Sequence, residues 1–272
     1  MNAVTQLPLW LAYTAVGAAL LSGIVSLGAT RRHPGFLHIG SFALLAASGA
    51  SGIVAGGWVL LANFTLTDQI AFGLPWLHWH LRLDPLSGFF FVVLHLLVFA
   101  IGLYGPHYTR EYTRGASPQP LPPLGVFTAV FILGMQLLLL ADDAFMFMVF
   151  WEMMSVGGYM LVAYQHQHAA NRQAAFLYLL LAHIGALVIL IAFGILAAFG
   201  GGYSFEAMRA GLAEQIGTDP LTGCLNRRSL ESRLKADWRL AKRRSTHVAV
   251  VAIDLDHFKQ INDTRGHPVG DV

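Results

Sequence analysis

Six long apolar stretches dominate this chain of 272 residues. They cover approximately residues 7–29, 36–62, 88–104, 124–141, 144–164 and 175–199. Because a helix needs about 20 apolar residues to cross the hydrocarbon core of a bilayer, each stretch is close to the length of a transmembrane helix. The first stretch has no basic residues before it, unlike a cleaved signal peptide. The sequence therefore predicts an all-α, polytopic membrane bundle of about six helices.

Charged residues divide the chain into two unlike regions. The chain as a whole is only 12% charged, and residues 1–203 contain no lysine. A soluble domain would carry about 25% charged residues. From Ser204 onward, acidic and basic residues crowd together. We therefore expect a membrane domain over residues 1–203, a linker over 204–217 and a second domain over 218–272. A single cysteine, Cys224, excludes an internal disulfide.

The arginines predict an orientation, because cytoplasmic loops of membrane proteins are enriched in Lys and Arg. Alternate loops carry the arginines, and the loops between them carry the aspartates. The exception is Arg82, which stands beside Asp84. This pattern predicts an N-terminus outside and, after six spans, a C-terminus outside. The arginines in question are Arg31, Arg32, Arg110, Arg114 and Arg172, and the aspartates are Asp68, Asp142 and Asp143.

Three ionisable side chains fall inside predicted spans: Glu152, His95 and His183. A carboxylate at the bilayer centre costs about 2.5–3.5 kcal/mol and usually faces a bundle interior or a water path. Imidazole titrates near neutral pH, so these three residues are suited to a proton path. Each histidine is equally consistent with a neutral, hydrogen-bonded packing residue. For Glu152, the insertion cost favours a functional role.

Four motifs carry a family resemblance over about residues 5–213: RLDPLS, YTREY, FWEMMS and LLLAHIG. They resemble the large membrane subunit of hydrogenase-4 and formate hydrogenlyase, of the antiporter-like family shared with respiratory complex I. The resemblance implies a proton-translocating subunit in the bacterial inner membrane, beside other membrane subunits of such an assembly. Glu152 matches the fifth-helix glutamate of the family, and His183 matches a sixth-helix histidine. The family glutamate works with a lysine on a seventh helix, which we expect to be missing here because the first lysine is Lys235.

The charged region begins with a predicted amphipathic helix. Asn226 is suited to cap its start, after a turn at Pro220 and Gly223. Acidic residues interrupt the basic ones, which indicates a solvated face and no nucleic-acid partner. The run VAVVAID that follows is typical of a buried strand and ends at Asp254. The apolar stripe of the helix consists of Leu230, Leu234, Trp238 and Ala241.

The segments DPLTGCLNRR and DLDHFKQINDTRGHPVGD resemble the N-terminal part of a GGDEF diguanylate cyclase domain, over residues 218–272. The resemblance implies an incomplete α/β fold, GTP as substrate, Mg²⁺ as cofactor and a homodimer if the chain is a cyclase. Asp254 would ligate Mg²⁺ by its side chain and Leu255 by its carbonyl. No catalytic residue is assigned, and we expect no cyclase activity, because the GGDEF hairpin itself does not follow. The nucleotide would be held by Asn262, His267 and Asp271.

Three functions remain open on the sequence. The first is a truncated proton-translocating-type membrane subunit fused to an incomplete cyclase domain. The second is a membrane-anchored diguanylate cyclase, which makes cyclic di-GMP from two GTP and uses the six helices as a sensor. The third is an inert membrane protein with neither activity. Because GTP is cytoplasmic, the predicted outside position of the tail favours the first over the second.

Overall fold

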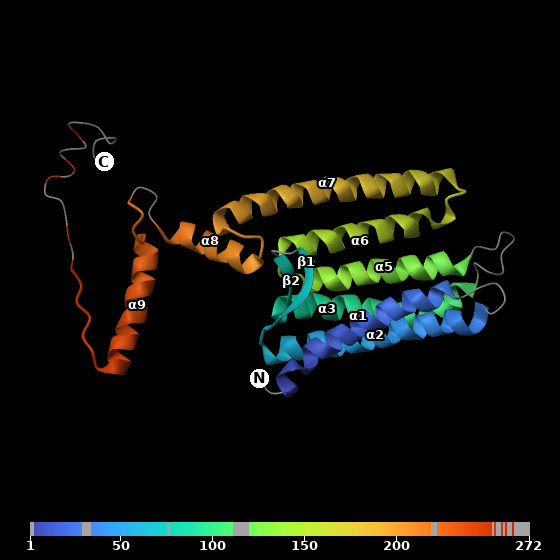
Figure 1. Ribbon diagram of the computed structural model, residues 1–272, viewed down its shortest axis with the longest axis horizontal. Helices are drawn as coiled ribbons and strands as arrows, with labels where there is room; N and C mark the ends of the chain where they lie inside the picture. The colour runs from blue at the N-terminus through green and yellow to red at the C-terminus, as the bar shows by residue number, and fades with distance from the viewer. Residues whose placement is uncertain are drawn as a thin grey trace. The chain divides into compact units, whose positions relative to one another are not determined.

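The computed structural model describes residues 3–28, 34–74, 77–110, 120–218 and 222–251, together with positions 253, 257, 259 and 263. The chain divides into two compact units, Met1–Met208 and Arg209–Val272. The first unit is a bundle of long helices with a β-hairpin at one end (Figure 1). Its helices are α1 (Ala3–Leu27), α2 (Pro34–Ala62), α3 (Pro85–Tyr108), α5 (Leu121–Leu140), α6 (Ala144–Val162) and α7 (Ala169–Gly200).

All six of these helices are long and apolar enough to cross a membrane. The predicted bundle of six spans is therefore confirmed, and the chain is a multi-pass membrane protein. The observed bounds differ from the predicted ones mainly where a helix extends past its apolar stretch. The start of α3 shows this, because Asp84 caps the helix and Pro85 opens it three residues before the predicted Gly88.

A β-hairpin between α2 and α3 was not predicted. Strand β1 (Leu66–Leu74) pairs antiparallel with β2 (Leu77–Leu83), with a register shift between Ile70 and Gly73. Leu81 and Leu83 of β2 are buried in the apolar cluster at this end of the bundle. The hairpin is joined to the α5–α6 turn by a hydrogen bond of 2.8 Å from the backbone N–H of Asp142 to the carbonyl of His80.

Small residues let α2 approach α3 closely. A Cβ placed on Gly52 would overlap the His95 ring, and one on Gly56 would lie 2.6 Å from the carbonyl oxygen of Gly88. The four-residue spacing of these two glycines is typical of helices that approach each other closely. A second apolar cluster fills the space between α1, α2, α3 and α5; its buried members are Ala19, Phe42, Leu45, Leu94, Val98, Ile132 and Leu133.

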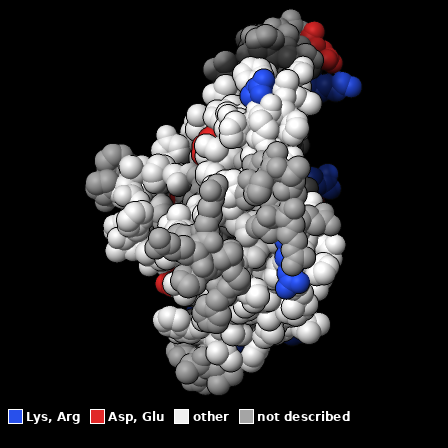
Figure 2. All heavy atoms as spheres, turned by 90° about the vertical axis from the view of Figure 1, so that its right-hand side faces the viewer, with Lys and Arg blue, Asp and Glu red and all other residues white. Residues whose placement is uncertain are grey.

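The helices alternate in direction, so that the start of α1 and the end of α7 both lie at the hairpin end (Figure 1). Arg110, which follows α3, and Arg172, in the first turn of α7, belong to the opposite end. Figure 2 looks onto that side of the molecule, where a few basic groups lie among largely uncharged side chains. Asp84 and Asp143 instead cap helices at the hairpin end. Of these described residues, Arg110 and Arg172 thus lie at one end of the bundle and the capping aspartates at the other, with Arg82 beside Asp84 as the exception.

The last span, α7, packs on the bundle along one narrow face. Its buried residues are Ala175, Ala186 and Ala197, which recur every three turns on one side of the helix. Most of its large apolar side chains are exposed, including Phe176, Leu181, Leu187 and Ile191. The helix therefore presents a long apolar surface that this unit does not cover.

Helix α8 (Phe205–Gly217) begins in the first unit, where Met208 is buried against Ala144 and Ala197. In the second unit, the predicted amphipathic helix is confirmed as α9 (Arg227–Arg244). Asn226 caps it by accepting a hydrogen bond of 3.0 Å from the backbone N–H of Ser229. Gly223, in the turn before it, has a left-handed φ of +67°.

The strand predicted over VAVVAID is not formed in the part of that run that the structure describes. Residues 248–251 and 253 have no strand assignment, and Val251 and Ile253 are 80% and 88% exposed. A strand forms only where a neighbour accepts and donates its backbone hydrogen bonds. The described residues of this unit place no such neighbour beside the run.

Candidate functional site

Glu152 and His183 lie side by side in the middle of α6 and α7. The Nε2 atom of His183 is 3.4 Å from Oε2 of Glu152. The Glu152 side chain is 40% exposed and the His183 side chain is 50% exposed, so the pair lies at the outer edge of the α6–α7 contact. The sequence placed both residues inside spans but did not anticipate that His183 would contact the Glu152 carboxyl group.

The hydrogen bonds of His183 determine where a proton can reside. Its Nδ1 is 2.9 Å from the carbonyl oxygen of Leu179, which can only accept, so Nδ1 carries a hydrogen. The Nε2 atom is then free to exchange a proton with the Glu152 carboxyl group. The pair can exist as carboxyl with neutral imidazole or as carboxylate with imidazolium, and both forms hold the same number of protons. Close by, Trp151 Nε1 donates to the carbonyl of Ala182 at 3.4 Å and links the two helices.

His95 lies in a different part of the bundle, in the seam between α2, α3 and α5. Its side chain is completely buried, and its Nδ1 is 2.7 Å from the carbonyl oxygen of Phe91. Its Nε2 is 3.0 Å from Nε2 of Gln136, which is also completely buried. The structure therefore brings Glu152 and His183 together and places His95 in a separate polar cluster. Their roles in a proton path stay a prediction.

Sequence reasoning missed Gln136 and Ser48, the two other polar members of the His95 cluster. Gln136 donates from its carboxamide nitrogen to Ser48 Oγ at 2.9 Å, and Ser48 donates to the carbonyl of Ala15 at 2.7 Å. The cluster therefore connects α1, α2, α3 and α5. A glutamine in an otherwise apolar run, FILGMQLLLL, was the available signal, since a buried carboxamide needs hydrogen-bond partners.

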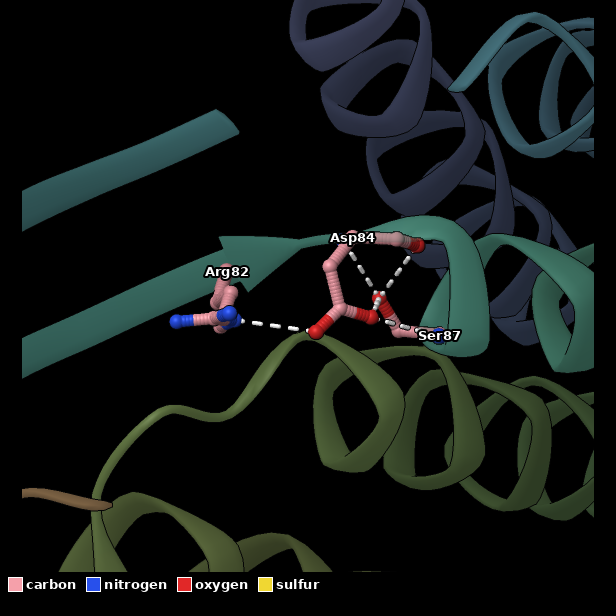
Figure 3. Close-up of polar contacts among 3 residues, drawn as sticks. All are labelled: Arg82, Asp84 and Ser87. Carbon is pink, nitrogen blue, oxygen red and sulfur yellow. Dashed lines mark hydrogen bonds and ion pairs between the residues drawn. The ribbon is translucent and has the colours of Figure 1, made fainter. Parts of the chain in front are cut away.

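The RLDPLS motif has a structural role at the hairpin end (Figure 3). Asp84 accepts a hydrogen bond of 2.9 Å from the backbone N–H of Ser87, whose hydroxyl accepts one of 2.8 Å from the N–H of Asp84. Arg82 Nε donates to Asp84 Oδ2 at 3.0 Å. This ion pair neutralises Arg82, the arginine that was the exception among the loops that carry aspartates. Partial burial raises the pKa of Asp84, but the hydrogen bonds from Ser87 and Arg82 and the charge of Arg82 outweigh it and hold the pKa below its ordinary value.

The residues predicted to bind Mg²⁺ and GTP, namely Asp254, Leu255, Asn262, His267 and Asp271, all lie outside the described residues. Among the residues that the structure does describe, no three His, Cys, Asp or Glu side chains converge so that they could hold a metal ion. The nucleotide and metal assignments therefore stay predictions that rest on resemblance.

Comparison with protein families matches two family models to adjoining parts of the chain. Residues 141–225 match the transmembrane domain of NADH:quinone oxidoreductases and Mrp antiporters. This range contains both Glu152 and His183. Residues 216–272 match the GGDEF domain of diguanylate cyclases. Both predicted resemblances are confirmed, and the chain carries an antiporter-like membrane region followed by a GGDEF segment.

Individual relatives divide in the same way. Hydrogenase-4 component B of Escherichia coli (strain K12) is 36% identical over 162 residues, which are 59% of this chain and 23% of that protein. The probable diguanylate cyclase DgcC of Escherichia coli (strain K12) is 45% identical over 53 residues, which are 20% of this chain and 14% of that protein. The chain thus spans less than a quarter of the length of each of these relatives.

One solved structure supports the fold of the membrane part. A chain of the membrane-bound sulfane sulfur reductase, an archaeal respiratory membrane complex, aligns with a TM-score of 0.54 and 15% sequence identity. The alignment covers 80% of this chain and 46% of that chain. At this identity, the similarity concerns the fold alone.

Proposed function

We propose that the membrane region is a proton-translocating-type subunit, in which Glu152 and His183 exchange a proton in the middle of the membrane. The contact of 3.4 Å between their side chains is the observation that carries this proposal. A carboxyl group and an imidazole that share one proton can transfer it from one to the other without a change in the net charge of the pair. His95 would serve the same process from the neighbouring seam.

The position of this pair also supports a partner in the membrane. Ionisable groups in a bilayer usually face protein or water, because contact with lipid is costly. Glu152 and His183 are about half exposed, and the adjoining face of α7 is apolar and uncovered. We infer that other membrane subunits of a hydrogenase or complex I-like assembly cover this face, in a bacterial inner membrane.

Charge separation along the bundle supports an orientation. Arg110 follows α3 and Arg172 lies in the first turn of α7, both at the end away from the hairpin. Asp84 and Asp143, which cap α3 and α6, lie at the hairpin end. Since cytoplasmic loops are enriched in arginine, the hairpin end would be outside. Both the N-terminus and the GGDEF segment would then be on the outer side.

Replacement of Glu152 tests the proposed proton transfer. The full chain is reconstituted in lipid vesicles, and inward proton movement under an imposed potential is followed with a pH-sensitive dye. Glu152→Gln keeps the size of the side chain but cannot exchange a proton, so we expect the rate to fall by about tenfold or more. Glu206→Gln makes the same chemical change at an exposed residue of α8, outside the spans, and should leave the rate unchanged. Equal rates for the wild type and Glu152→Gln would refute the role of Glu152.

The GGDEF match over residues 216–272 favours one alternative, a membrane-anchored diguanylate cyclase with a six-helix sensor. In that protein the substrate would be GTP, the cofactor Mg²⁺ and the active form a homodimer. Formation of cyclic di-GMP by the purified full chain, given GTP and Mg²⁺, would favour this alternative. A tail on the outer side, where GTP is absent, would count against it.

A further inference from the structure

We propose that His95 and Gln136 form a proton-binding switch in which the Gln136 carboxamide turns over when His95 takes up a proton. The two side chains are completely buried and meet in the seam between α3 and α5. The inference adds a second proton-binding site to the proposed function. It rests on that function only for where the proton goes after it leaves His95.

The neutral state follows from the atoms that face the ring. Nδ1 of His95 is 2.7 Å from the carbonyl oxygen of Phe91, so it must carry a hydrogen. Nε2 is 3.0 Å from the carboxamide nitrogen of Gln136, which can only donate. Nε2 therefore accepts, and the imidazole is neutral with its hydrogen on Nδ1.

Gln136 is oriented by the same contacts. Its nitrogen has two hydrogens, one for His95 and one for Ser48 Oγ at 2.9 Å. Its oxygen, in contrast, is buried and has no hydrogen-bond partner. A buried acceptor without a partner is unfavourable, so this orientation is held mainly by the two bonds that its nitrogen donates. Any change that removes the acceptor on His95 removes one of those bonds.

Protonation of His95 is such a change. One new N–H bond forms at Nε2, no other covalent bond changes, and the ring then needs an acceptor where it had a donor. Turning the Gln136 carboxamide exchanges its nitrogen and oxygen, which are similar in size, and places the oxygen toward Nε2. The imidazolium would then donate to Gln136 and Phe91. The Phe91 ring, with its centroid 4.1 Å from that of His95, would further stabilise the charge.

No charged side chain competes for this proton within the four helices around the seam. The sequences of α1, α2, α3 and α5 contain no Lys, Arg, Asp or Glu. The His95 ring is met by Gly52 of α2, Phe91 of its own helix and Gln136 of α5. The other titratable side chains described on these helices are Tyr13, which donates to Asp68; His38, which contacts Thr109; and Tyr104, His107 and Tyr108 near the end of α3.

The wild-type protein tests the first half of the proposal. The full chain, labelled with ¹⁵N-histidine and embedded in lipid bilayers, is titrated from about pH 8 to about pH 4 and followed by solid-state NMR. His95 is assigned by the signals that disappear in His95→Asn. We expect hydrogen on Nδ1 and none on Nε2 at high pH, and hydrogen on both nitrogens at low pH. The opposite neutral tautomer, with hydrogen on Nε2, would overturn the switch.

Two variants test the carboxamide. Gln136→Met keeps the size but removes both the donor to the neutral ring and the acceptor for the imidazolium. Because a hydrogen bond from a charged ring is the stronger of the two, the titration midpoint of His95 should fall by about one pH unit. Gln136→Glu, in its ionised form, offers only acceptors and adds a negative charge beside the ring, so it should raise the midpoint. Ser155→Ala removes a buried hydroxyl on α6 that bonds within its own helix and should leave the midpoint unchanged. Equal midpoints in wild type and both Gln136 variants would overturn the proposal. The titration midpoints are measured by NMR and do not depend on proton movement across vesicles. A result that overturns the switch is therefore distinct from one that refutes the proposed proton transport.

Discussion

His183 on α7 presents Nε2 to Oε2 of Glu152 on α6 at 3.4 Å, near the middle of both helices. The glutamate therefore has a titratable partner within this chain, on the adjacent span. The two residues are 31 positions apart in the sequence, yet their side chains are in contact. Proton exchange between them can therefore be tested by replacing either one.

If Glu152 and His183 share one proton, removal of either side chain removes the same step. We expect His183→Gln to lower vesicle proton movement by about tenfold, as Glu152→Gln does, and the double variant to be no slower than either single variant. The measurement is the rate of dye acidification in matched vesicles. Losses that multiply, to about a hundredfold in the double variant, would indicate two independent steps and contradict a shared proton.

Gly52 permits the contact between α2 and α3 where His95 lies. Gly52→Ala would place a methyl group on the His95 ring, and we expect it to lower the free energy of unfolding by about 1–3 kcal/mol. Gly57→Ala on the same helix is the matched control, because a Cβ there meets no atom within 4 Å. It should be neutral or slightly stabilising. Unfolding of the full chain in detergent micelles measures both, and equal stabilities would contradict the close contact.

Asp84 joins the hairpin to α3 through the cap and the Arg82 contact. Asp84→Ala removes both and should lower the free energy of unfolding by about 1 kcal/mol, whereas Asp84→Asn keeps the cap and should cost less. Because folding lowers the pKa of Asp84, its contribution is complete above the ordinary value of 3.8 and is lost as the pH falls through the lower folded value. The difference between wild type and Asp84→Asn should therefore shrink in acid. A difference that grows as the pH falls would refute this assignment.

Cys224 reports the side of the membrane that the tail reaches. It is the only cysteine in the chain and is exposed. With the hairpin end outside, a membrane-impermeant maleimide should label Cys224 in intact spheroplasts. Gln167→Cys in a Cys224→Ser background places a thiol in the exposed α6–α7 turn at the other end. It should react only after permeabilisation. The reverse pattern would put the tail in the cytoplasm and favour the cyclase alternative.

Several features followed from local sequence alone. The lengths of the apolar stretches determined the six spans, because the thickness of the hydrocarbon core sets how long an apolar helix must be. Asn226 and the apolar stripe beginning at Leu230 likewise predicted α9, since capping and helical spacing act over a few residues. The alternation of Leu77, Trp79, Leu81 and Leu83 was a comparable local signal for β2 that the sequence interpretation did not use.

The polar contacts depended on tertiary structure. Sequence placed Glu152, His183 and His95 inside predicted spans, but the rotation and packing of the helices decided that the first two meet and that His95 meets Gln136 instead. The run at Val248 shows the same dependence in reverse, because an apolar pattern allows a strand but only hydrogen-bonded neighbours form one. Crossing the membrane is a requirement on each helix separately, whereas a shared proton requires two side chains on different helices to point at each other.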